Sequence, residues 1–236
     1  MTIKIGPLLV NRRPFGGILA YMRMWLAFGS LTSLLIALSA CASTAPGRPL
    51  NVPIPTSIYQ VSVTDIDGQT VPLSIFKGRL LLIVNTASYC GYTAQYAGLE
   101  TIFERYRAQG LTVLAFPTND FLNEEPGSSQ QIKEFCTANY QASFPLFAKI
   151  KAVGPFSHPL YQWLTTANPR TAGPITWNFN KFLVSRNGTV LARFDSSVDP
   201  AAPEVLSRIE AALWVSQAPW LAAPILGHSF PQLWSN

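Results

Sequence analysis

Alternating and continuous apolar runs predict a β-hairpin followed by a buried strand. Residues 57–63 alternate between polar and apolar side chains, and Asp67-Gly68 supplies a tight turn before Val71. The next apolar run, at residues 80–86, begins with five aliphatic residues and shows no polar alternation there. Such a run is typical of a strand that is buried on both faces.

A helix and another strand are predicted after this run. Apolar residues from Leu99 to Tyr106 recur at the i, i+3, i+4 and i+7 positions that form one face of a helix. Gly110 is a suitable helix stop, and the largely apolar residues 111–116 follow it as a strand. The three elements together make a strand–helix–strand unit.

Two more helices and a second hairpin are predicted in the C-terminal half. Ser128 and Gln131 have the spacing of a capping box, ahead of a helix whose apolar face includes Cys136. Residues 187–188, Asn-Gly, lie between two short apolar runs, and residues 203–214 have an amphipathic helical pattern. This order of elements predicts an α/β protein with a thioredoxin-like fold, in which helices flank a central mixed β-sheet that follows an N-terminal β-hairpin.

The N-terminal 40 residues differ in composition from the rest of the chain. They hold four of the 17 basic residues and none of the 12 acidic residues, so they account for most of the formal net charge of +5. Without them, basic and acidic residues nearly balance. We therefore expect no nucleic-acid partner, because the electrostatic support for one is lost.

Residues 1–40 are predicted to be a signal peptide of the lipoprotein type. Arg23 precedes a charge-free apolar stretch, residues 25–40, that is short for a membrane span. The ending at residues 38–41, LSAC, resembles a bacterial lipobox, which implies that Cys41 is lipid-modified and becomes the mature N-terminus. Cleavage with lipidation is favoured over a permanent transmembrane anchor.

Two details of this segment stay open. Met22 is an alternative start, because residues 22–41 alone form a compact lipoprotein signal, and Arg12-Arg13 weakly resembles a twin-arginine signal. The predicted location is the bacterial cell envelope, with the protein lipid-anchored on the periplasmic side of a membrane. Ala42 favours the outer membrane over the inner one.

The remaining boundaries follow from composition. Residues 41–56 are rich in Ala, Ser, Thr and Pro and are predicted to be the lipidated N-terminus and a tether. Residues 57–212 are the predicted folded domain, and residues 213–236 are a C-terminal tail to which we assign no role.

Cys90 lies where the strand at residues 80–86 gives way to a helix. Backbone N–H groups and the positive end of the helix dipole favour a thiolate at such a place, and the thiolate is the nucleophilic form of cysteine. The alternative is a small buried core residue. The polar, turn-like surroundings favour a reactive cysteine.

Cys136 is the second cysteine of the predicted domain. An exported compartment tolerates disulfides, so a static bridge between Cys90 and Cys136 and a catalytic pair both stay open. The chain contains no Cys-x-x-Cys motif, and its two histidines make no convincing zinc site. We therefore expect no metal and no other cofactor.

Three blocks, taken in order, resemble the glutathione peroxidase family of thiol peroxidases. They are residues 84–93 (VNTASYCGYT), 114–127 (LAFPTNDFLNEEPG) and 177–184 (WNFNKFLV). The resemblance covers about residues 57–212, the whole predicted domain. It implies a peroxidase enzyme on a thioredoxin-like fold.

The resemblance also implies roles for individual residues. Cys90 matches the peroxidatic cysteine, and Trp177 and Asn178 match the indole and the amide that surround it. Both groups donate hydrogen bonds to a thiolate or to a departing peroxide oxygen without adding charge. Cys136 lies in the helix that carries the resolving cysteine in thioredoxin-using members, although an inert core cysteine is the alternative. The helix must unwind locally if the two Cα atoms are to approach within about 7 Å.

Two positions depart from the family pattern. Asp120 stands where the family usually has glutamine, and a carboxylate beside Cys90 would disfavour the thiolate. Asp120 is either protonated, turned away, or the acceptor of the thiol proton, and the sequence does not choose between these. Thr118 stands where many relatives carry a further cysteine, so no disulfide arises there.

The expected reaction reduces hydrogen peroxide and organic or lipid hydroperoxides to water or alcohols, in response to oxidative stress. Cys90 becomes a sulfenic acid and then forms a disulfide with Cys136, which an external dithiol reduces. A thioredoxin-like protein is favoured over glutathione, because an internal resolving thiol makes glutathione unnecessary. A monomer is expected, since the stretch between Leu164 and Trp177 lacks the long insertion of tetrameric relatives.

Three rival functions are retained. A thioredoxin-fold disulfide reductase or isomerase would require a Cys-x-x-Cys motif, which the chain lacks. A copper-delivery lipoprotein would require two nearby cysteines and a histidine. A redox-inert structural lipoprotein would have Cys90 and Cys136 permanently bridged.

Overall fold

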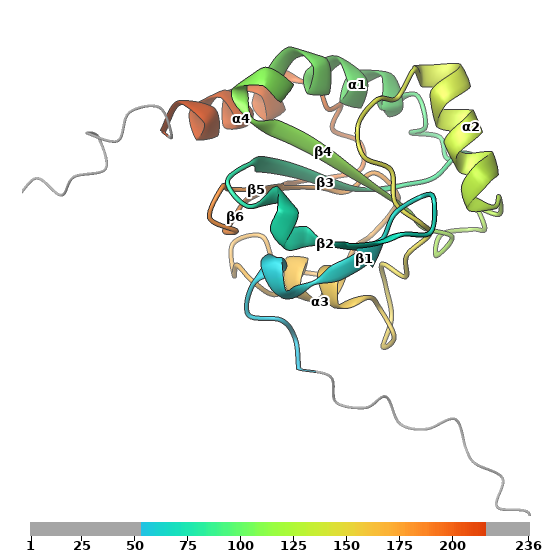
Figure 1. Ribbon diagram of the computed structural model, residues 1–236, viewed down its shortest axis with the longest axis horizontal. Helices are drawn as coiled ribbons and strands as arrows, with labels where there is room; N and C mark the ends of the chain where they lie inside the picture. The colour runs from blue at the N-terminus through green and yellow to red at the C-terminus, as the bar shows by residue number, and fades with distance from the viewer. Residues whose placement is uncertain (1–52, 216–236) are drawn as a thin grey trace, which may run out of the picture. The chain divides into compact units, whose positions relative to one another are not determined.

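A four-stranded sheet lies at the centre of the part of the chain that the computed structural model describes, residues 53–215 (Figure 1). Its strands, in sheet order, are β4 (Leu111–Pro117), β3 (Leu80–Thr86), β5 (Lys181–Val184) and β6 (Val190–Phe194). β3 and β4 are parallel, and the other two pairings are antiparallel. The predicted mixed sheet is confirmed.

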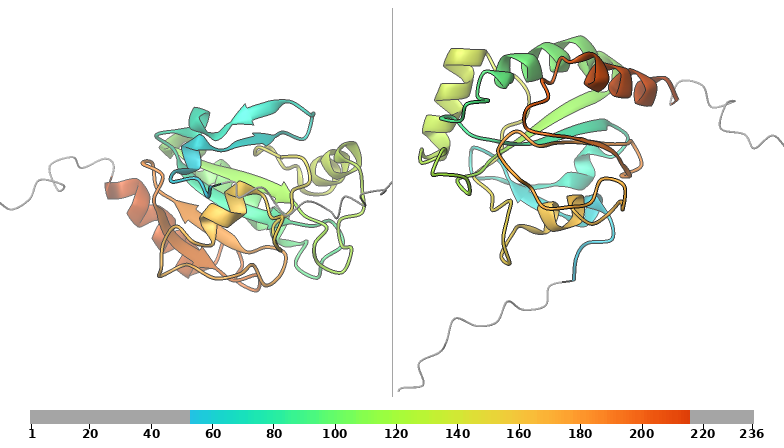
Figure 2. Two further views of the ribbon diagram at one scale, coloured as in Figure 1. Left: turned by 90° about the horizontal axis from the view of Figure 1, so that it is seen from below. Right: turned by 180° about the vertical axis from the view of Figure 1, so that it is seen from behind.

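The sheet has a cover on each face (Figures 1 and 2). The helices α1 (Gln95–Tyr106), α2 (Ser129–Tyr140) and α4 (Pro203–Val215) lie on one side. The short helix α3 (Pro159–Leu164) lies on the other, with a hairpin of β1 (Ser62–Thr64) and β2 (Thr70–Pro72). Single-turn 3₁₀ segments occupy Ile58–Gln60, Leu73–Phe76 and Arg107–Gln109.

The continuous apolar run of β3 is explained by this two-sided cover. Leu80, Leu82 and Val84 belong to the core beneath α1, α2 and α4, whereas Leu81 and Ile83 belong to the core beneath α3 and the hairpin. All five side chains are fully buried. Because alternate residues of a strand point to opposite faces, a strand covered on both faces is apolar at every position.

Local signals confirm most of the predicted boundaries. Gly110 adopts φ 108° after the helical segment, a conformation that costs glycine little. The side chain of Ser128 accepts a hydrogen bond from the Gln131 backbone amide, and the Gln131 side-chain oxygen accepts one from the Ser128 backbone amide, which completes the capping box. The hairpin is shorter than predicted, because its first residues form a 3₁₀ turn instead of a strand.

One helix was not predicted. In α3, the His158 side chain accepts a hydrogen bond from the Leu160 amide at the helix start, and Pro159 occupies the first turn. The helix has only six residues, too few for its apolar residues to display a helical period.

Several predictions fall outside the described residues. They are the signal peptide, the lipidation of Cys41, most of the tether at residues 41–56 and most of the C-terminal tail at residues 213–236. Within residues 53–215, every helix is too short or too polar to span a bilayer.

Candidate active site

Cys90 lies in the turn between β3 and α1, at the end of the sheet toward which the parallel strands point. Thr93 holds this turn: its hydroxyl accepts a hydrogen bond from the Cys90 amide (3.0 Å) and donates one to the Ala87 carbonyl (2.9 Å). The Tyr92 amide points at the sulfur, with a nitrogen–sulfur distance of 3.5 Å. The thiol is therefore positioned by backbone and by one threonine.

Burial opposes ionisation of the Cys90 thiol. The side chain is only 7% exposed, and desolvation raises its pKa above the ordinary value for cysteine. The Tyr92 amide and the Trp177 indole lower the pKa, while the Glu124 carboxylate raises it. The backbone N–H expected at the helix start is thus present, but burial outweighs it, so the pKa of the thiol is raised rather than lowered.

Trp177 and Asn178 reach the site from the loop that leads into β5. The Asn85 side chain donates a 3.0 Å hydrogen bond to the Trp177 carbonyl, and the Phe179 amide donates one of 2.6 Å to the Asn85 carbonyl. The Trp177 indole interacts with the Cys90 thiol, as the resemblance implied. β3 itself therefore holds this loop beside the cysteine.

Asn178 contacts a carboxylate. It is fully buried, and its side-chain amide donates a 2.8 Å hydrogen bond to Glu124 Oε2. Its own oxygen, Asn178 Oδ1, is buried without a hydrogen-bond partner. The Asn178 side-chain amide thus binds the Glu124 carboxylate in this structure, a link that the sequence did not suggest.

Glu124 is the site residue that sequence reasoning missed. Leu122 and Asn123 just before it both have positive φ, 46° and 58°, so the loop bends sharply and returns toward Cys90. The Tyr89 amide then donates a 3.0 Å hydrogen bond to the Glu124 carbonyl. No glycine marks this bend, and its one local signal is Asn123, a residue type that tolerates positive φ.

Asp120 points away from Cys90, which corrects its placement among the catalytic residues. Its Oδ2 accepts hydrogen bonds from the amides of Ala152 (2.6 Å) and Val153 (3.1 Å) and from the Thr118 hydroxyl (2.9 Å). Of the three alternatives for Asp120, the structure shows the one in which it is turned away. Asp120 instead fixes a neighbouring loop.

Cys136 is free and completely buried on the inner face of α2. Burial raises the pKa of its thiol to about 11, with a small opposing contribution from the Tyr96 hydroxyl. Cys90 is free as well, and both cysteines belong to the same core cluster. A resolving role for Cys136 stays a prediction, and it requires α2 to open because the thiol is shielded and protonated here.

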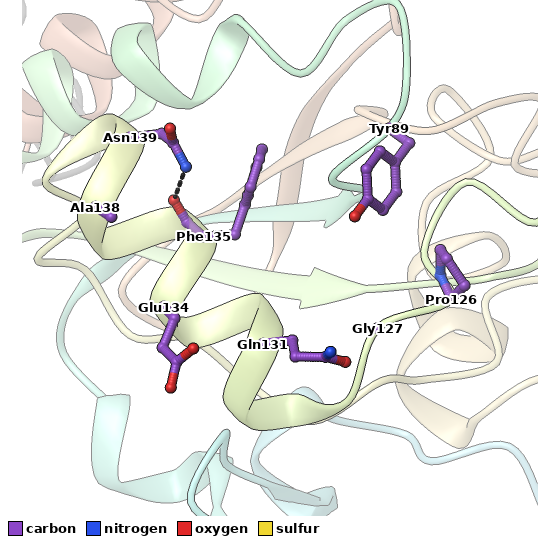
Figure 3. Close-up of a pocket in the computed structure, with 8 residues that line it drawn as sticks. All are labelled: Tyr89, Pro126, Gly127, Gln131, Glu134, Phe135, Ala138 and Asn139. Carbon is purple, nitrogen blue, oxygen red and sulfur yellow. Dashed lines mark hydrogen bonds between the residues drawn. The ribbon is translucent and has the colours of Figure 1, made fainter.

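A cavity of about 560 Å³ separates the Cys90 turn from the outer side of α2 (Figure 3). Tyr89 lies on one side of it and Phe135 on the other, with ring centroids 6.4 Å apart. Opening of α2 at Cys136 would therefore move a wall of this cavity. Within residues 53–215, no group of three or more His, Cys, Asp or Glu side chains is placed to hold a metal ion.

Known proteins resemble this chain in sequence. A family model described as glutathione peroxidase matches residues 58–165. A hydroperoxy fatty acid reductase of Synechocystis is 47% identical over 161 residues, which cover 65% of this chain and 94% of the relative. The thioredoxin/glutathione peroxidase BtuE of Escherichia coli is 42% identical over 178 residues, 66% of this chain and 97% of the relative.

A solved structure agrees with these sequence matches. The crystal structure of T. cruzi GPX1 superimposes with a TM-score of 0.54 at 36% sequence identity, over 67% of this chain and 97% of that one. The likeness bears out the thioredoxin-like fold. The chain is a peroxidase that belongs to the glutathione peroxidase family.

Proposed function

We propose that this peroxidase reduces hydrogen peroxide and organic or lipid hydroperoxides through Cys90. The observation that carries the proposal is the position of the Cys90 sulfur between the Tyr92 amide and the Trp177 indole. Both are neutral donors that stabilise negative charge on sulfur during attack on the peroxide. Attack forms a sulfur–oxygen bond and breaks the O–O bond, which leaves a sulfenic acid on Cys90 and releases water or an alcohol.

Cys136 then resolves the sulfenic acid. Its thiol condenses with the Cys90 sulfenic acid, so that an S–S bond forms and water leaves. The half-buried aromatic residues Phe135 and Tyr140 hold the rest of the inner face of α2 against the core. These contacts must be released when the helix opens, and the cavity between Tyr89 and Phe135 provides space for that movement.

A thioredoxin-like protein is the proposed reductant, with glutathione as the second candidate. A dithiol reduces an internal disulfide by exchange through a mixed disulfide. The relative from Escherichia coli is described as a thioredoxin/glutathione peroxidase, which supports both donors. The lipid substrates are supported by the relative described as a hydroperoxy fatty acid reductase.

The cellular setting is proposed from the N-terminal segment alone. The protein is lipid-anchored through Cys41 on the periplasmic side of the cell envelope, in the outer membrane, and it acts as a monomer. Metabolic labelling with palmitate tests the anchor: the full chain should incorporate label, and Cys41→Ser should not. Labelling of both proteins to the same extent would overturn the anchor.

The enzymatic proposal is tested by peroxide consumption coupled to thioredoxin and its reductase, with trapping of the sulfenic acid by dimedone. Wild type should turn over, and Cys90→Ser should neither turn over nor bind dimedone. Cys136→Ser should bind dimedone but lose thioredoxin-dependent turnover.

Thr137→Ala changes the exposed neighbour of Cys136 on the same helix and should keep wild-type turnover. This control shows whether a substitution on α2 is harmful in itself. Full thioredoxin-dependent turnover by Cys136→Ser would overturn the resolving role while leaving the peroxidatic role of Cys90 intact.

A further inference from the structure

Asn180 is fully buried at the end of the loop that carries Trp177, directly before β5. Its side-chain nitrogen donates hydrogen bonds to the Trp177 carbonyl (3.3 Å) and to the Ser196 hydroxyl (2.8 Å). Its side-chain oxygen accepts two from the Arg193 guanidinium, one from Nε (3.1 Å) and one from Nη2 (2.7 Å). A carboxamide has two N–H donors and two lone pairs, so Asn180 uses its whole hydrogen-bonding capacity.

Arg193 fixes the direction in which the Asn180 amide points. Both of its hydrogen bonds to this amide go to the oxygen, and an amide turned the other way would set its NH₂ group against those donors. The same guanidinium donates to the carbonyls of Gly173 (2.8 Å) and Pro174 (2.6 Å), which precede Trp177 in the loop. The Asn180 NH₂ group is therefore held toward the Trp177 carbonyl.

The position of the Trp177 indole depends on its backbone. Trp177 lies between α3 and β5, outside regular helix and strand, and its side chain is only half-buried. The indole contacts the ring of Phe121, itself half-buried, with 5.5 Å between the ring centroids. Packing thus encloses only part of the indole, whereas the Trp177 carbonyl is bound by two side-chain amides, those of Asn180 and of Asn85 on β3 (3.0 Å).

The same network reaches the helix that begins after Cys90. Gln95, the first residue of α1, donates a 2.7 Å hydrogen bond from its side chain to the Ser196 carbonyl, and Asn180 binds the hydroxyl of that serine. All three side chains are buried, where hydrogen bonds are stronger than in water. Asn180 therefore links the Trp177 loop to the helix next to the cysteine.

We propose that Asn180 is a positioning residue, which holds the Trp177 backbone and thereby sets where the indole lies relative to Cys90. This role rests on that of Trp177 in the proposed function. Without the Asn180 donors, the Trp177 carbonyl keeps only the Asn85 amide of the two, and the link through Ser196 is lost. The indole then occupies more positions, and fewer of them support attack on the peroxide. The effect on the rate passes through Trp177, so it disappears when the indole is absent.

The test is a double-mutant cycle on the reduced full chain with Asn180→Asp and Trp177→Phe, followed by stopped-flow reaction with hydrogen peroxide. Asn180→Asp keeps an oxygen for Arg193 to bind and removes both donated hydrogen bonds. In the wild-type background it should slow sulfenic acid formation at Cys90 about 10-fold, since a misplacement of about 1 Å costs up to about 100-fold. In the Trp177→Phe background it should leave the rate within about twofold, the scatter that independent sites show.

Asn168→Asp is the matched control. Asn168 lies on the same segment between α3 and β5, and its side-chain NH₂ group also donates to a backbone carbonyl, that of Val190 (2.7 Å). The control should lower the free energy of unfolding, measured with urea, and should leave the peroxide rate near that of wild type.

Ser196→Ala is a second, milder variant. It removes one of the two acceptors of the Asn180 NH₂ group, so it should slow the reaction less than Asn180→Asp does, and again only when Trp177 is present. If Asn180→Asp does not fold, a wild-type rate in Ser196→Ala would overturn the positioning role.

Three further outcomes would overturn it. A wild-type rate in folded Asn180→Asp would show that the network does not set the indole. An equal loss in both backgrounds would show that Asn180 acts on the fold instead of through Trp177, and an equal loss in Asn168→Asp would show that the effect is not specific. Failure of the proposed function looks different: Trp177→Phe alone would then react as fast as wild type, or wild type no faster than free cysteine.

Discussion

The buried ammonium group of Lys181 donates a 2.7 Å hydrogen bond to the carbonyl oxygen of Phe179. Phe179 has a φ of 64°, a conformation that bulky residues rarely adopt, and it directly follows Trp177 and Asn178. Lys181 also donates a 3.3 Å hydrogen bond to the carbonyl of Asp195 on the neighbouring chain segment. A charged group inside the protein thus secures the turn that presents two residues of the site.

The first prediction concerns the pH dependence of stability. Burial lowers the pKa of Lys181 from 10.5 to about 8. Between these pH values the unfolded chain binds more protons than the folded one, so the lysine contribution to the free energy of unfolding rises with pH. Relative to Lys181→Met, wild type should gain about 3 kcal/mol across this window, measured by urea unfolding at several pH values.

Tyrosines with raised pKa values, such as Tyr96 and Tyr161, are present in both proteins. Their ionisation in the unfolded chain lowers stability at high pH in both, so the difference between the two proteins isolates the lysine. A difference that stays constant from pH 7 to pH 11 would contradict the lowered pKa of Lys181.

The second prediction concerns the order in which the cysteines react. Both thiols are buried and have raised pKa values, but Cys136 is completely inaccessible and its pKa is about 11. As the pH is raised, iodoacetamide should modify Cys90 first, with a midpoint above that of free cysteine, and Cys136 only afterwards. Mass spectrometry of the two peptides measures this order. Modification of Cys136 before Cys90 at neutral pH would show that α2 is already open.

The third prediction concerns the role of Asp120. Asp120 Oδ2 accepts hydrogen bonds from two backbone amides and a hydroxyl, and Lys151 Nζ lies 3.5 Å from Oδ1. Asn at this position would remove the negative charge that these donors bind and place an NH₂ group against the Lys151 ammonium. Asp120→Asn should therefore lower the free energy of unfolding by about 2 kcal/mol. The rate of Cys90 sulfenic acid formation in the folded variant should stay within about twofold of wild type, far from the loss of about 100-fold expected for a positioned acid–base group. Stopped-flow measurement after verifying the fold checks this, and a loss of that size would return Asp120 to the catalytic residues.

The fourth prediction concerns backbone strain in the loop. Leu122 has a φ of 46°, and its side chain is 80% exposed. The strain of the left-handed conformation is therefore not offset by burial of the leucine side chain. Leu122→Gly should stabilise the protein by about 1 kcal/mol, since the left-handed conformation costs a non-glycine residue about 1–2 kcal/mol. Thermal unfolding checks this, with the exposed Leu191→Gly in β6 as a control that should destabilise. Equal destabilisation by both substitutions would rule out strain at Leu122.

Much of the fold was predictable because its signals are local. Gly110 ends a helical segment, Ser128 and Gln131 cap the next helix, and Asn187-Gly188 forms the turn between β5 and β6. Each signal involves residues only a few positions apart, so it does not depend on packing against distant parts of the chain. The helix α3 lacked a periodic pattern long enough to recognise.

The site was predictable only in part. Sequence placed Cys90 at the end of a buried strand and drew attention to Trp177 and Asn178. It did not show that Asn178 binds Glu124, because these residues are 54 positions apart and meet only through packing. The sequence also suggested Asp120 as the carboxylate near Cys90, because it did not predict the bend at Leu122.

By itself, then, the sequence determined most of the strands and helices, pointed to the family and singled out Cys90 as the predicted nucleophile, because periodicity, caps, turns and motifs are properties of neighbouring residues. Only the tertiary structure decided which carboxylate Asn178 binds and in which direction the pKa of the Cys90 thiol is shifted. Both depend on burial and on contacts through space, and desolvation of Cys90 arises from segments that lie far from it along the chain.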